Sequence, residues 1–104
     1  MDKAYVQEIA LKMIGHAGDA FSYYFQALDE AKKHNYDKSN KLIEEGNSSL
    51  NKAHNLQTEM LSKEAGGEDS AYSIIMVHAQ DHLMNSILVK KLIVELIEMR
   101  KLHN

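Results

Sequence analysis

The chain has 104 residues, a formal net charge of −3 and a hydrophobic content of 44%. This length predicts one domain with a modest core, and an acidic balance without a basic cluster argues against nucleic acid or an anionic membrane as the main partner. The absence of cysteine excludes a disulfide framework and a thiolate zinc site. The N-terminal residues carry mixed charges and no secretory signal, so we expect a cytoplasmic protein.

The first predicted element is an amphipathic helix over about residues 3–33. Apolar residues recur at intervals of seven in two series, one from Val6 to Ala27 and the other from Ala10 to Ala31. Both series fall on a single stripe of a helix. The chain also lacks proline, so nothing in this stretch opposes helix formation.

A second helix is predicted over about residues 37–65. It follows the segment HNYD, in which an asparagine and an aspartate are suitable caps, and its apolar residues again recur at helical spacing. The segment GGEDS at residues 66–70 ends this helix. Its two glycines stop one helix, and Asp69 or Ser70 is expected to cap the next.

A third helix is predicted over about residues 70–101. With the two short connections it gives an all-α fold, an antiparallel three-helix bundle that forms a single domain over residues 1–104. Apolar residues occupy nearly the whole circumference of this third helix. Because a lone three-helix bundle buries one face of each helix, a helix that is apolar all round requires further cover. We therefore expect the chain to associate with copies of itself through this helix.

Four polar side chains interrupt the third helix, in the segment VHAQDHLMN at residues 77–85. At about 100° per residue, Asp81, His82 and Asn85 lie within about 60° of His78 on the helical wheel. Such groups argue against a membrane-spanning helix, and their burial without partners is costly. Four of them on one stripe indicate a site.

Two chemistries fit this stripe. His78 and His82 have the i, i+4 spacing of a helical zinc motif, but Ala79 stands where that motif has glutamate, and the sequence identifies no third ligand. Alternatively, a neutral imidazole accepts a phosphoryl group on one nitrogen while a hydrogen bond at the other nitrogen, with His82 or a carboxylate as orienting partner, fixes the tautomer. A different class of protein stays open: a helical oligomerisation or metal-binding module whose His/Asp cluster is structural. Without a glycine-rich phosphate loop, a phosphate-handling chain would receive its phosphate from another protein.

The segment VHAQDHLMNSIL at residues 77–88 closely resembles the active-site helix of the enzyme IIA components of the lactose/cellobiose family of the bacterial sugar phosphotransferase system. GDAFSYYFQAL at 18–28 and AHNLQTEML at 53–61 resemble other recurrent segments of that family, in the same order. The resemblance implies a homotrimer of three-helix bundles that carries phosphate as phosphohistidine during uptake of a β-linked disaccharide. It implies that the histidine-containing phosphocarrier protein supplies the phosphoryl group. A cysteine of the cognate IIB component, which serves a membrane IIC transporter, would accept it.

The resemblance also implies roles for individual residues. His78 matches the phosphorylated histidine, Asp81 matches an aspartate near the three-fold axis that is associated with a divalent cation, typically magnesium, and Gln80 matches a glutamine associated with the phosphoryl group. On the wheel Gln80 lies about 200° from His78, so it is expected to serve the histidine of a neighbouring subunit, a solvated side chain being the alternative. Two positions depart from the family pattern: Phe21 stands where a basic residue is usual, and Asn85 where threonine is common.

Overall fold

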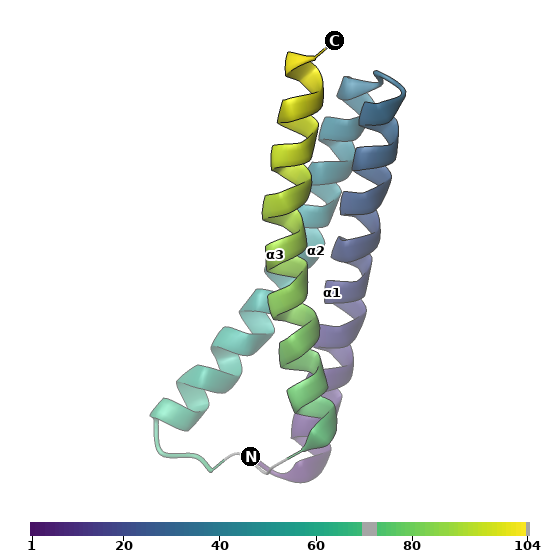
Figure 1. Cartoon of the computed structure of the whole chain (residues 1–104). Coiled ribbons are helices and arrows are strands. Elements are labelled where there is room, and N and C mark those ends of the chain that lie inside the picture. Colours follow the sequence, from purple (N-terminus) through teal and green to yellow (C-terminus); the bar gives the residue numbers. More distant parts are fainter. Residues whose placement is uncertain (70–72, 104) are drawn as a thin grey trace.

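The computed structural model describes residues 1–69 and 73–103. Within them lie three long helices, α1 (Lys3–Lys32), α2 (Tyr36–Ala65) and α3 (Ile74–Leu102), and no strand. The helices run up, down and up (Figure 1), in a particle that measures 53 Å along its longest axis. The prediction of an all-α, three-helix chain is confirmed. None of the described helices has a stretch long and apolar enough to cross a membrane.

The start of α3 differs from the expected one. Ser73 is its N-cap, and the Ser73 hydroxyl accepts a hydrogen bond from the backbone N–H of Met76 at 3.4 Å. Asp69, one of the two predicted caps, therefore does not cap this helix. Ser70, the other predicted cap, and the predicted helix start lie outside the described residues. The predicted ranges 3–33 and 37–65 differ from α1 and α2 by one residue each, at the turn that joins the two helices.

The core lies along α1, which packs against both other helices, whereas α2 and α3 meet each other much less. The two series of residues predicted at intervals of seven are fully buried, together with one isoleucine. Alanine supplies five of these positions, and its small side chain allows the neighbouring helices to approach closely. The buried residues of α1 are Val6, Ile9, Ala10, Met13, Ala17, Ala20, Tyr24, Ala27 and Ala31.

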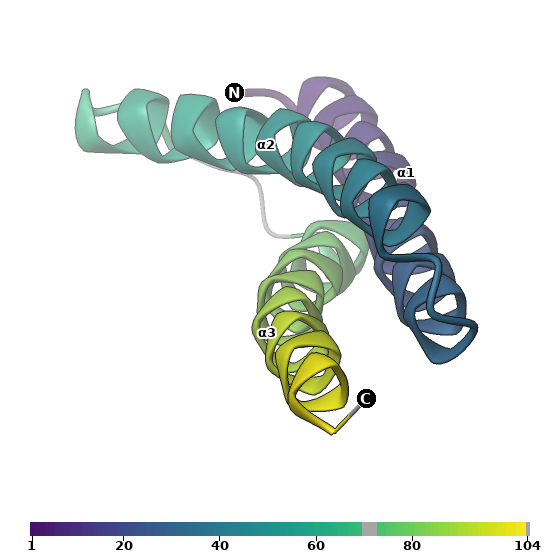
Figure 2. The ribbon, with the colours of Figure 1, turned by 90° about the horizontal axis from the view of Figure 1, so that it is seen from above.

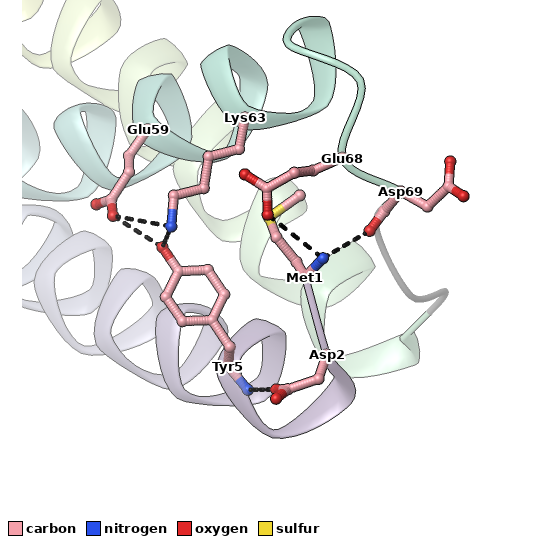
Figure 3. Close-up of polar contacts among 7 residues, drawn as sticks. All are labelled: Met1, Asp2, Tyr5, Glu59, Lys63, Glu68 and Asp69. Carbon is pink, nitrogen blue, oxygen red and sulfur yellow. Dashed lines mark hydrogen bonds and ion pairs between the residues drawn. The ribbon is translucent and has the colours of Figure 1, made fainter.

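The C-terminal half of α2 diverges from both α1 and α3 (Figures 1 and 2). A polar cluster ties this part of α2 to the start of α1 (Figure 3). The Tyr5 hydroxyl donates to the Glu59 carboxylate at 2.8 Å and accepts from the Lys63 ammonium at 2.9 Å. This hydrogen bond from Lys63 raises the pKa of the Lys63 ammonium. The flank of α3 that faces this half of α2 is consequently less covered than the flank that faces α1.

Helices α1 and α2 approach closely at Gly46. A Cβ atom on Gly46 would lie 2.6 Å from Cε1 of Tyr24, well inside van der Waals contact. The Tyr24 ring is fully buried, and its hydroxyl donates to Oδ1 of Asn47 at 2.8 Å. Burial raises the pKa of this hydroxyl to about 12. The ring is therefore held at its edge and at its tip, and it has little freedom to move aside.

Replacement of Gly46 by alanine should lower the free energy of unfolding by about 1–3 kcal/mol, because the added methyl group overpacks the Tyr24 contact. Gly15→Ala is the matched control: Gly15 is exposed in α1 and no atom lies within 4 Å of its added Cβ. There the substitution should stabilise the protein by about 0.5–1 kcal/mol through helix propensity alone. Urea unfolding of both variants measures the difference, and a stabilised Gly46→Ala protein would contradict the close approach.

Candidate functional site

His78 and His82 lie one turn apart on α3, and their rings are in contact. Their Nε2 atoms are 2.9 Å apart, and the two ring planes are perpendicular. A separation of this length is a hydrogen bond, which requires a proton on one Nε2 and a lone pair on the other. The two histidines are thus in contact through Nε2 of each ring, while the orienting role of His82 stays a prediction.

The packing of α3 against α1 determines how exposed each of the two histidine side chains is. Ala79 and Leu83 are fully buried, and the buried Ser86 hydroxyl donates to the backbone carbonyl of Ala17 at 3.0 Å. With that face of α3 held inside, His78 is exposed and His82 is half-buried. The ring of His78 is therefore accessible to another protein, and the ring of His82 is less so.

Gln80 lies on the other side of α3, half-buried, where it meets α2. The amide nitrogen of Gln57 donates to the carboxamide oxygen of Gln80. The amide nitrogen of Gln80 in turn lies 3.8 Å from the sulfur of Met76. Between Gln80 and His78 of the same chain there is no hydrogen bond in the described structure, as their separation on the helical wheel predicts. The sequence assigned no role to Gln57. Its contact joins two different helices, and the spacing of residues along one helix does not predict how two helices are aligned with each other.

Between these two flanks, α3 presents apolar side chains to solvent. We call this surface the apolar ridge, and its members are between 46% and 81% exposed. Asp81 is exposed within the ridge, and His78 and Gln80 lie about 80° to either side of its midline. His78, Gln80 and Asp81 all line one open depression of about 470 Å³ over the ridge. The apolar ridge consists of Ile74, Val77, Met84, Leu88, Leu92, Leu96, Met99 and Leu102.

Metal ligands are few within a single chain. No group of three or more His, Asp or Glu side chains in the described residues is placed to hold a metal ion. Asp81 contributes one carboxylate, and His78 and His82 direct their Nε2 atoms at each other. A cation at Asp81 would therefore take its remaining ligands from water or from further copies of the chain.

A second, smaller pocket of about 210 Å³ lies beside His82 and is lined by Gly18, Phe21 and Asn85 as well. The rings of Phe21 and Phe25 are 4.9 Å apart, and both are more than two-fifths exposed. The two positions that depart from the family pattern, Phe21 and Asn85, thus meet at one place next to His82. Here α1 presents an aromatic surface where the resemblance leads to the expectation of a positive charge.

Known proteins share this sequence and fold. The family model described as PTS system, Lactose/Cellobiose specific IIA subunit, matches residues 8–101. The PTS system lactose-specific EIIA component of Staphylococcus epidermidis is 46% identical over 101 residues, which cover 97% of each chain. The crystal structure of the PTS cellobiose-specific enzyme IIA from Bacillus anthracis has a TM-score of 0.90 and 36% identity, and covers 97% of this chain and 91% of that one.

A third relative was solved in a complex. The solution structure of the IIA(Chitobiose)-HPr complex, from the N,N'-diacetylchitobiose branch of the Escherichia coli phosphotransferase system, has a TM-score of 0.79 and 30% identity. It covers 97% of this chain and 96% of that one. The sequence matches nearly the full length of the Staphylococcus epidermidis relative, and the fold matches more than nine-tenths of both solved chains. The chain belongs to the lactose/cellobiose-specific IIA subunit family of the phosphotransferase system.

Proposed function

We propose that the chain acts in the cytoplasm and carries a phosphoryl group on His78 during the uptake of a β-linked disaccharide. Membership of the family makes it a phosphoryl-transferring component of a sugar phosphotransferase system. The observation that supports His78 as the carrier is its exposed ring, whose Nε2 lies 2.9 Å from Nε2 of His82. A purely structural His/Asp cluster is not favoured, because neither His78 nor Asp81 is buried.

The histidine pair suits transfer between two proteins. With its proton on Nδ1, neutral His78 has a lone pair on Nε2, which forms the new bond to phosphorus while the bond from phosphorus to the donor breaks and its electron pair returns to the donor. His82, with its proton on Nε2, donates to that lone pair beforehand and to a phosphoryl oxygen afterwards. The pair therefore needs no cofactor to hold the tautomer that attacks.

The donor and acceptor are proposed from the relatives. Because the Escherichia coli relative was solved in a complex with HPr, we infer that this chain receives its phosphoryl group from the histidine-containing phosphocarrier protein. It then passes the group to a cysteine of its cognate IIB component, which serves a membrane IIC transporter. The exposed position of His78 allows both proteins to reach the same nitrogen in turn.

We further propose that the chain is a homotrimer assembled through the apolar ridge. An apolar surface of this extent is seldom left in water. A closed three-fold arrangement around the ridge brings one flank of α3 against the opposite flank of the next copy. Gln80 of one subunit then faces His78 of its neighbour, which accounts for a phosphate-contacting residue on the flank away from its own histidine.

In this trimer the three Asp81 carboxylates converge near the axis. Like charges a few ångströms apart in apolar surroundings repel strongly. A shared divalent cation relieves that repulsion, and magnesium suits a site made of carboxylate oxygens. The exposed position of Asp81 within the ridge supports this arrangement, since the cation takes one ligand from each subunit.

Phosphoenolpyruvate and the general phosphotransferase proteins should place one acid-labile, base-stable phosphate on His78. His78→Ala should abolish the label and leave the circular dichroism spectrum unchanged, because the side chain is exposed. His103→Ala, at an exposed histidine beyond the end of α3, should be labelled like the unmodified protein. Label that persists in His78→Ala, or that maps to His82 by mass spectrometry, would remove the assignment.

The protein should sediment as a trimer at micromolar concentration. The double variant Leu88→Lys/Leu92→Lys should sediment as a folded monomer, because both side chains are more than half exposed in the single chain and lie on the ridge. Ser48→Lys adds a charge to the exposed surface of α2 and should stay trimeric. A monomeric parent protein, or a trimeric double variant, would show that the ridge is not the interface.

Asp81→Leu should raise the melting temperature of the trimer, because replacement of a buried charge cluster by apolar side chains often stabilises by about 1–4 kcal/mol. A chelator should lower the melting temperature of the unmodified protein and leave that of the variant unchanged. His78 should still accept phosphate in the variant, since Asp81 takes no part in the attack. A variant that melts earlier, at a temperature independent of protein concentration, would place Asp81 away from a shared axis.

A further inference from the structure

We propose that Gln57 is a positioning residue, which determines which end of the Gln80 carboxamide faces the phosphoryl group. The inference rests on the proposed function, because it takes Gln80 as a contact to phosphate on His78 of the neighbouring subunit. It adds a residue of α2 to a site otherwise built from α3. Gln57 acts through Gln80 and is not itself required to touch phosphate.

The hydrogen bond between the two side chains has a defined direction. Nε2 of Gln57 donates to Oε1 of Gln80, and both residues are half-buried. Nε2 of Gln80 lies 3.8 Å from the Met76 sulfur, which can accept a weak hydrogen bond and cannot donate one. The nitrogen end of the Gln80 carboxamide therefore belongs beside Met76, and the oxygen end beside Gln57.

This direction matters because a phosphoryl group presents acceptors alone. The N–H groups of a carboxamide bind its oxygens, whereas the carboxamide oxygen would repel them. With Oε1 engaged by Gln57, the Gln80 nitrogen directs one N–H towards Met76 and keeps a second N–H, for which the described structure shows no other acceptor. Without Gln57, the carboxamide is free to rotate by half a turn and present its oxygen to the phosphate.

The contact joins helices that otherwise meet little. Gln57 belongs to the half of α2 that diverges from α3 (Figures 1 and 2), and this half is anchored to α1 by Tyr5, Glu59 and Lys63. Gln57 is therefore held by α1 and α2 while it reaches Gln80 on α3. A side chain fixed in this way can hold the carboxamide in one orientation throughout repeated cycles of transfer.

Gln57→Met, which keeps the length of the side chain and removes its donor, tests this role. The kcat for phosphoryl transfer through His78 should fall about tenfold, the equivalent of one lost hydrogen bond to a charged group. The KM for the donor protein should change by less than about twofold. Gln26→Met, at an exposed glutamine of α1 that bonds to Ser22, should leave both constants unchanged. Melting temperatures of both variants identify any loss of structure.

A double-mutant cycle separates action through Gln80 from direct action. Gln80→Met should reduce kcat by a similar factor, and the double variant Gln57→Met/Gln80→Met should be no slower than Gln80→Met alone. The side-chain amide signals of Gln80 in ¹H–¹⁵N spectra should shift on phosphorylation of the unmodified protein, and this shift should be lost in Gln57→Met. A merely structural role for Gln57 would not move these signals selectively.

Three results would overturn the proposal: a Gln57→Met protein with unchanged kcat, a double variant that loses the product of the two single effects, and Gln80 amide signals that ignore the substitution. With normal labelling of His78, these results remove the role of Gln57 and leave the phosphocarrier function intact. An unmodified protein that takes no label on His78 removes the proposed function, and the role of Gln57 falls with it.

Discussion

The rotation of α3 about its own axis, fixed by its packing on α1, is the constraint on which the rest of the molecule depends. Ala79, Leu83 and the Ser86 hydroxyl, bound to the Ala17 carbonyl, hold one face of α3 inside the chain. The orientation of the remaining faces of α3 follows from which face is buried. The apolar ridge points outward, and His78 and Gln80 lie on opposite flanks of it. A small rotation would bury the His78 ring or part of the apolar ridge, and the proposed interface between copies would no longer carry the proposed site.

The divergence of α2 from α3 leaves part of α3 uncovered. The C-terminal half of α2 contacts α1 through Tyr5 and Lys63, and it diverges from α3 (Figure 1), so the flank of α3 that carries Gln80 is less covered than the flank that faces α1. The contact between Gln57 and Gln80 bridges the two helices at this place. The divergence of α2 is therefore compatible with a site shared between subunits, in which each bundle supplies a histidine on one side and a carboxamide on the other.

Several features could be read from the sequence because they depend on spacing along one helix. Both seven-residue series of α1 are buried as predicted, and the i, i+4 spacing brings His78 and His82 into contact. Features that depend on the register between helices could not be read in this way. Two features depend on the position of one whole helix along its neighbour. They are the pairing of Gln57 with Gln80 and the pocket beside His82 that Phe21 and Asn85 both line. The predicted N-cap at Asp69 is wrong because the linker offers several suitable side chains and spacing alone does not distinguish Ser73 from them.

The central claim is that each site is shared between two subunits, and co-refolding of two inactive or slow variants tests it most directly. Equal amounts of His78→Ala and Gln80→Met are unfolded together, refolded, and assayed for the rate of phosphoryl transfer in a single turnover. If Gln80 serves the neighbour's His78, roughly a quarter of all sites in the refolded mixture regain both intact residues, and a fast phase appears that neither variant shows alone. If Gln80 serves its own chain, or if the chains do not associate, the mixture shows no fast phase, and the shared site is contradicted.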